Sequence, residues 1–162
     1  MSREYSLDEI FAIAEQIERN GAQFYTRAAQ LARPPELAAT LHQLAEWETG
    51  HESTFAGMRQ RANSAAQRGD WDPEGEAESY LRALASDYVF KSNPSPAESL
   101  TGTESAAEIY RLALGLEKQA ILFYEGMKAA ISDDSDRALL DELIREEMSH
   151  VTYLTERMET PH

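Results

Sequence analysis

Two short motifs of the same form hold the residues best suited to chemistry. Glu48-x-x-His51 and Glu147-x-x-His150 each place a carboxylate and an imidazole three residues apart. Residues at this spacing lie on the same face of a helix, so each pair projects in one direction. Both pairs interrupt rows of apolar residues in steps of three and four, the pattern of a helix face turned into a core. A buried carboxylate without a partner is costly, so other groups must compensate it.

The chain repeats itself at an offset of 99 residues. The offset holds through two predicted helices and the turn between them, which indicates a duplicated helical hairpin. It also identifies a further glutamate in each copy. The polar residues related by the offset are Glu18 and Glu117, Glu48 and Glu147, and His51 and His150.

Hydrophobic periodicity predicts four long helices, at about residues 7–32, 35–62, 104–131 and 134–158. Ser6 and Glu9 form a capping-box pattern that opens the first helix, and Pro34 ends it. Residues 63–103 break the pattern. We expect them to form a long crossover with one short helix at about 74–90, which serves as a lid or a contact surface and carries no chemistry.

The helix lengths predict where the polar residues meet. About 14 residues separate Glu18 from the end of its helix, and about 13 separate the start of the next helix from Glu48. At a rise of about 1.5 Å per residue, both distances are near 20 Å, so an antiparallel hairpin brings Glu18 level with Glu48 and His51. Two such hairpins, paired about a pseudo-twofold axis, form an all-α four-helix bundle. Its centre then holds four carboxylates and two imidazoles.

This set of side chains predicts a two-metal site. Four carboxylates in an apolar core repel one another, and two divalent cations balance their charge. Oxygen and imidazole nitrogen without thiolate suit iron or manganese, and zinc also binds such ligands. Di-iron carboxylate bundles use one Glu from each of two helices and Glu-x-x-His from each of the other two. The alternative is a set of buried Glu–His ion pairs, which rarely stabilise a core more than apolar side chains do.

At these residues the chain resembles the ferritin-like superfamily, and within it the di-iron domain of the rubrerythrins. The resemblance covers the four long helices. Bacterioferritins share the same six-ligand pattern and remain an alternative. The matching motifs are Glu18-x-x-Gly21-x-x-Phe24-Tyr25-x-x-Ala28-Ala29, Leu44-Ala45-x-x-Glu48-x-x-His51, Glu117-x-x-Ala120-x-x-Phe123-Tyr124 and Glu147-x-x-His150.

The resemblance implies a role for each polar residue. Glu48 and Glu147 would bridge two iron ions. The other ligands would complete one ion each, Glu18 with His51 and Glu117 with His150. Family members reduce hydrogen peroxide or dioxygen at such a centre, or oxidise ferrous iron there. The expected function is therefore that of a di-iron oxidoreductase, an enzyme reset by an external electron donor. The alternatives are an iron-handling protein for ferrous oxidation and storage or transfer, and a non-enzymatic metal-binding module.

Two departures from rubrerythrins affect this expectation. Rubrerythrins carry a second, cysteine-ligated iron domain for electron delivery, and this chain has no cysteine. They also carry an extra Glu three residues after the ligand in the third helix, where this chain has Ala120. A more symmetric site is therefore expected.

Two tyrosines are the candidate catalytic residues, and three other aromatic or histidine residues are not assigned to the site. Tyr25 and Tyr124 follow their glutamates by two helical turns, and they either hydrogen-bond ligands, donate electrons or simply pack. Trp47 is expected to pack in the core. His42 and His162 are expected to be exposed bystanders.

Composition limits the partners. The 162 residues fit one domain, 1–162, and the net charge of −14 opposes binding to nucleic acid or anionic membranes. No apolar run approaches the roughly 18 residues of a membrane span, and no signal peptide is evident, so a cytoplasmic location is expected. A homodimer or larger homo-oligomer is also expected. The small residues considered for its interface are Ala28, Ala29, Ala38 and Ala39.

Overall fold

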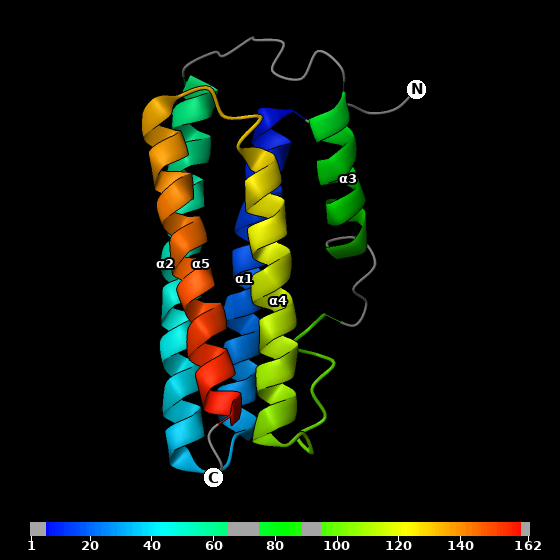
Figure 1. Ribbon diagram of the computed structural model, residues 1–162, viewed down its shortest axis with the longest axis vertical. Coiled ribbons are helices and arrows are strands. Elements are labelled where there is room, and N and C mark those ends of the chain that lie inside the picture. The colour runs from blue at the N-terminus through cyan, green and yellow to red at the C-terminus, as the bar shows by residue number, and fades with distance from the viewer. Residues whose placement is uncertain (1–5, 65–74, 89–94, 160–162) are drawn as a thin grey trace.

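The computed structural model describes residues 6–64, 75–88 and 95–159. The described residues form five α-helices and no strand. Four long helices lie side by side as a bundle, and a short one lies along its flank (Figure 1). The long helices are α1 (Leu7–Leu31), α2 (Pro35–Ser64), α4 (Ala106–Met127) and α5 (Asp134–Glu159), and the short helix is α3 (Glu76–Tyr88).

The bundle consists of two antiparallel hairpins. Helix α1 packs most extensively against α2, and α4 packs against α5, while α1 and α4 join the hairpins. Helices α2 and α4 run in the same direction, so the chain between them must return along the length of the bundle (Figure 1). The predicted all-α bundle of two hairpins with a long crossover is therefore confirmed. None of the described helices has the length and apolar character needed to span a membrane.

Local sequence explains where the helices begin. Ser6 and Glu9 form the predicted capping box, in which the Glu9 carboxylate accepts from the Ser6 backbone N–H at 2.9 Å. Ser105 and Glu108 form the same arrangement at α4. Each box satisfies two backbone N–H donors that the helix leaves without partners at its start. The second box lies within the range predicted for the third long helix, so α4 begins after Ser105 and not at 104.

The predicted end of the third long helix, near residue 131, is wrong. Helix α4 ends at Met127, and residues 128–130 form a turn in which the Ala130 N–H donates to the Met127 carbonyl at 2.9 Å. Ala130 and Ile131 are nevertheless buried, so the apolar pattern continues beyond the helix. The short helix covers Glu76–Tyr88 within the predicted 74–90, and residues 74, 89 and 90 of that prediction lie outside the described residues.

Helix α3 packs against α4 through small and apolar residues. Leu81 and Ala85 are buried and belong to the bundle core. A Cβ at Gly126 of α4 would lie 2.7 Å from the Tyr80 ring, so the glycine permits this close approach.

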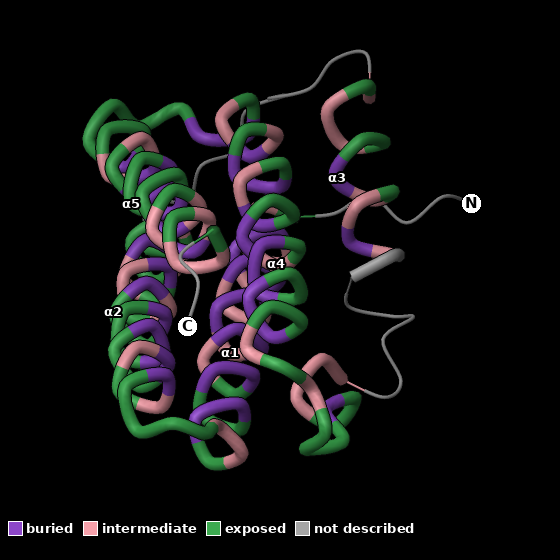
Figure 2. Tube along the Cα trace, turned by 60° about the horizontal axis from the view of Figure 1, so that its bottom comes forward, coloured by how far each residue is buried: buried purple, intermediate pink, exposed green. Residues whose placement is uncertain are grey.

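The apolar core has two parts, with the polar motifs between them. Buried residues line the inner faces of the long helices (Figure 2). Along α1, one apolar cluster ends at Ile17 and the other begins at Phe24, and buried Glu18 lies between them. Ala28 and Ala29 belong to the second cluster, so the expectation that they form an interface between chains is wrong. Of the four alanines considered, Ala39 is exposed and Ala38 is half-buried.

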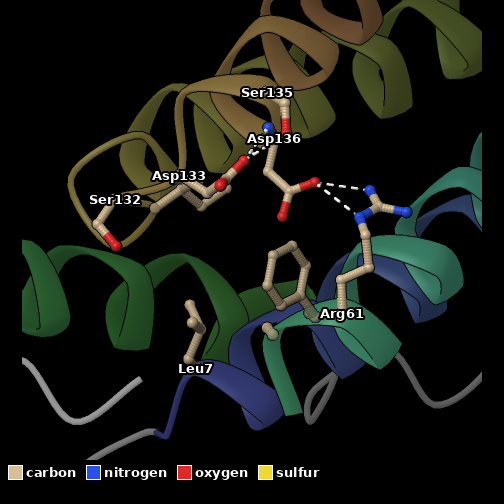
Figure 3. A pocket seen from close by; sticks show the side chains of 9 residues that line it. Leu7, Arg61, Ser132, Asp133, Ser135 and Asp136 are labelled. Carbon is tan, nitrogen blue, oxygen red and sulfur yellow. Dashed lines mark hydrogen bonds and ion pairs between the residues drawn. The ribbon is translucent and has the colours of Figure 1, made fainter. Parts of the chain in front are cut away.

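A separate cavity of about 90 Å³ lies at the end of the bundle where α1 begins and α2 ends (Figure 3). Leu7, Phe11 and Ile131 line its apolar side. On its polar side Arg61 pairs with buried Asp136, at 2.6 Å between Nη2 and Oδ1 (Figure 3). None of the six polar residues of the motifs lines this cavity. The ion pair therefore ties α2 to α5 at a distance from the motifs.

Replacing Arg61 with Ala should lower the free energy of unfolding by about 1–2 kcal/mol, because it leaves the buried Asp136 carboxylate without its cation. This is less than for a fully buried pair, since the Arg61 side chain is 54% exposed and solvent screens it. Thermal unfolding of Arg61→Ala and of Arg137→Ala, an exposed arginine on α5, tests the effect. Equal melting temperatures of the two variants would contradict it.

Candidate metal centre

The structure brings the six predicted residues together in the middle of the bundle. Glu18 comes from α1, Glu117 from α4, and each Glu-x-x-His motif from α2 or α5. All six side chains are buried. They form two groups of four, and within each group one potential ligand atom per residue lies within 4.8 Å of all the others. The groups are Glu18, Glu48, His51 and Glu147, and Glu48, Glu117, Glu147 and His150.

The first group contains buried polar atoms without hydrogen-bond partners. Among the described residues, only four buried side-chain atoms lack such a partner, and each member of this group supplies one. The atoms are Glu18 Oε2, Glu48 Oε1, Glu147 Oε1 and His51 Nδ1. His51 Nδ1 lies 2.7 Å from Glu147 Oε1 and 3.5 Å from Glu18 Oε2. Because buried polar groups are normally hydrogen-bonded, four buried atoms without a hydrogen bond, one from each member of a close group, fit a cation site.

The second group mirrors the first about the pseudo-twofold axis. His150 Nδ1 lies 3.0 Å from Glu147 Oε2 and 3.4 Å from Glu48 Oε1. Glu117 Oε2 is 3.5 Å from the same nitrogen. Both imidazoles therefore direct Nδ1 at the carboxylates, and their rings stack with centroids 5.6 Å apart.

Without a cation the carboxylates repel one another. Burial, followed by repulsion from Glu18 and the other carboxylates, raises the pKa of Glu48 well above its usual value. Burial by itself would lower the pKa of His51, but the neighbouring Glu147 and Glu18 carboxylates outweigh it and raise the pKa to about 11. Burial likewise acts to lower the pKa of His150, but the Glu117 and Glu147 carboxylates raise it to about 10. The metal-free cluster therefore holds protons that a bound metal must displace.

Two tyrosines extend the cluster and cross between the hairpins. The Tyr25 hydroxyl donates to Glu117 Oε1, and the Tyr124 hydroxyl donates to Glu18 Oε1. Both rings are fully buried, and burial raises the pKa of each hydroxyl well above 10, so both remain neutral donors. Each tyrosine occupies one oxygen of its glutamate and leaves the other oxygen, Oε2, directed at the cluster.

Gly21 makes room for a carboxylate of the cluster. A Cβ at this position would lie 2.8 Å from Glu48 Oε2, closer than real Cβ contacts. In the sequence, Gly21 belongs to the Glu18-x-x-Gly21 motif, but nothing there assigns it a role. Its role depends on the approach of α2, which the sequence does not give.

Two residues at the edge of the cluster, Glu146 and Trp47, lie outside the motifs that predict the metal site. Glu146 Oε2 lies 2.7 Å from His51 Nε2. Trp47 stacks on the His150 ring, with centroids 5.0 Å apart and planes inclined by 9°. The expectation that Trp47 packs in the core is wrong, since it is 38% exposed. Each residue directly precedes a core glutamate and therefore lies about 100° around the helix from it, at the border of the core. Of the expected bystanders, His42 is exposed, and His162 lies outside the described residues.

Four long helices in two hairpins, with buried Glu and His residues at their centre, define a ferritin-like bundle with a candidate two-metal site. The fold is similar to a crystal structure from Thermotoga maritima, described as that of a candidate ferritin-like diiron-carboxylate protein. The TM-score is 0.72, and the match covers 98% of this chain and 97% of that one at 19% sequence identity. The ferritin-like fold is thus confirmed. The sequence itself matches no protein-family model and no curated protein.

Proposed function

We propose that this protein is a di-iron carboxylate oxidoreductase that reduces hydrogen peroxide or dioxygen. The observation that carries the proposal is the pair of overlapping four-residue groups, which share Glu48 and Glu147. Two shared carboxylates between two imidazoles are what a pair of bridged metal ions requires. In this proposal the bridging ligands are Glu48 and Glu147, and the terminal ligands are Glu18 with His51 and Glu117 with His150.

The ligand types favour iron. Carboxylate oxygen and imidazole nitrogen suit iron or manganese, and zinc also binds them. Four carboxylates balance two divalent charges, which removes the repulsion present without metal. The described fold neighbour, a candidate diiron-carboxylate protein, supports the same choice.

Two ferrous ions, when bound, supply the two electrons that convert one hydrogen peroxide to two water molecules, a reaction that also consumes two protons. The chain's residues prepare the site for this chemistry. Tyr25 and Tyr124 hold the terminal glutamates in one orientation. The apolar clusters on both sides exclude bulk water. In this proposal, an external donor supplies the electrons that restore the ferrous state.

Rapid mixing tests the proposal. Anaerobic protein loaded with two ferrous ions per chain is mixed with peroxide, and the near-ultraviolet absorbance of ferric iron is followed. We expect a fast rise in absorbance, and steady peroxide consumption when a reductant is added. Both should vanish in Glu48→Ala and Glu147→Ala. Consumption that persists in both variants, or zinc that iron cannot replace, would contradict the proposal.

Gly21→Ala should weaken metal binding about tenfold with little loss of stability, because the new Cβ displaces only the Glu48 carboxylate. Gly50→Ala is the matched control. A Cβ at Gly50 meets nothing within 4 Å, so this variant should bind metal normally and gain about 0.5–1 kcal/mol in stability. Chelator competition with Co²⁺ measures the affinities. If Gly21→Ala bound metal with wild-type affinity, the position of the Glu48 carboxylate in this structure would not be required for metal binding.

A further inference from the structure

The repeat places unlike residues at one pair of equivalent positions beside the two imidazoles. Trp47 and Glu146 are related by the same offset of 99 residues as the six cluster residues. Each contacts the histidine of the opposite hairpin, Trp47 with His150 and Glu146 with His51. The cluster is otherwise symmetric in residue type, so these positions distinguish its halves.

Glu146 holds the outer nitrogen of His51. The 2.7 Å contact between Glu146 Oε2 and His51 Nε2 pairs the outer nitrogen with a carboxylate, while Nδ1 faces Glu147 and Glu18 and is the nitrogen that a metal would take once its proton is displaced. A carboxylate that accepts from the outer nitrogen of a metal-binding imidazole fixes the ring and strengthens it as a ligand. The contact also places one more negative charge beside this half of the cluster.

His150 has a different neighbour. The Trp47 ring covers its face and offers no acceptor in the plane of the imidazole. Among the described residues, none forms a hydrogen bond with His150 Nε2. His150 is therefore positioned by stacking, without the added charge.

Another break in the repeat does not favour either half. Gly21 corresponds to Ala120, and its contact is with Glu48, which belongs to both four-residue groups. Its effect is therefore shared between the two positions.

We propose that the two metal positions are unequal, and that Glu146 is the positioning residue that makes the position of Glu18 and His51 the tighter one. The inference rests on the proposed two-metal centre. The expected difference in Kd between the two positions is about tenfold. This is the lower end of the range of about 10–100-fold by which hydrogen-bond partners of metal ligands change metal affinity. The lower end applies because the Glu146 side chain is 60% exposed and solvent screens its charge.

Variants that keep one imidazole each measure the two positions separately. His150→Ala retains the His51 position, and His51→Ala retains the His150 position. Binding of the first Co²⁺ is measured by chelator competition, with circular dichroism to verify folding. We expect His150→Ala to bind about tenfold more tightly than His51→Ala. Adding Glu146→Gln should weaken binding about tenfold in His150→Ala and leave His51→Ala unchanged.

Variants at the border of the cluster provide a second test that leaves all six cluster residues in place. In the otherwise unaltered chain, Glu146→Gln should weaken the first Co²⁺ step, and Trp47→Glu should tighten the second. Equal affinities in the two histidine variants, or an equal effect of Glu146→Gln in both, would overturn the inference while leaving the two-metal centre intact. Fewer than two Co²⁺ per wild-type chain would instead overturn the proposed centre itself.

Discussion

Glu147→Gln should abolish binding of both metal ions. Glu147 is fully buried and belongs to both four-residue groups, so one substitution removes a negative charge and a ligand oxygen from each. Mutating a residue that only hydrogen-bonds a metal ligand lowers metal affinity by about 10–100-fold. Loss of a ligand shared by both metal ions should lower it by more than about 100-fold. Iron per chain, measured after anaerobic loading and desalting, should fall from two to nearly none.

The control for this variant is Glu142→Gln. Glu142 is exposed on the same helix, so the substitution makes the same chemical change outside the cluster. It should retain two irons per chain. Two irons in Glu147→Gln as well would mean that the cluster does not hold the metal.

Metal should stabilise the wild-type protein strongly, and Glu48→Gln should remove this effect. At about 1,000 times Kd, one bound ion adds roughly 4 kcal/mol to the free energy of unfolding. For a chain of this size that corresponds to a rise of about 8–16 °C in Tm. Glu48→Gln should show almost no rise, while Glu46→Gln, an exposed position on the same helix, should behave as wild type.

The same variant should be more stable than wild type in the absence of metal. Glu48 is buried beside three other carboxylates, and its Oε1 has no hydrogen bond. A neutral amide avoids this repulsion, and we expect a gain of about 1 kcal/mol or more. A metal-free Glu48→Gln protein that is less stable than wild type would indicate a structural network of ion pairs.

The gain should depend on pH, with a sign set by the raised pKa of Glu48. Burial raises that pKa in the folded state above the ordinary value of 4.5, so ionisation costs stability as the pH rises past 4.5. The advantage of Glu48→Gln should therefore be present near neutral pH and disappear at about pH 4. Chemical denaturation of the metal-free proteins at both values measures it. A gain of equal size at both pH values would mean that charge is not its cause.

The sequence predicted the centre of the molecule well because repetition and periodicity are local signals. The offset of 99 residues and the interrupted apolar rows were sufficient to select Glu18, Glu48 and His51 with their equivalents. Helix length then placed them at one level. The structure brings these same residues together.

The residues around the centre depend on packing between hairpins, which the sequence does not show. Tyr25 accompanies Glu18 along one helix, but its hydroxyl donates to Glu117 of the other hairpin. The large apolar side chain of Trp47 is typical of a core residue. Its position at the border of the core nevertheless leaves it partly exposed, with its ring stacked on His150. The end of α4 was missed for a related reason, because burial of the following turn continues the apolar pattern.

The most direct test of the central claim is anomalous diffraction from crystals of protein loaded with manganese. We expect two anomalous peaks per chain, one near His51 Nδ1 and one near His150 Nδ1, with Glu48 and Glu147 contacting both. Peaks only on the acidic surface, with the six side chains arranged as Glu–His ion pairs, would contradict it.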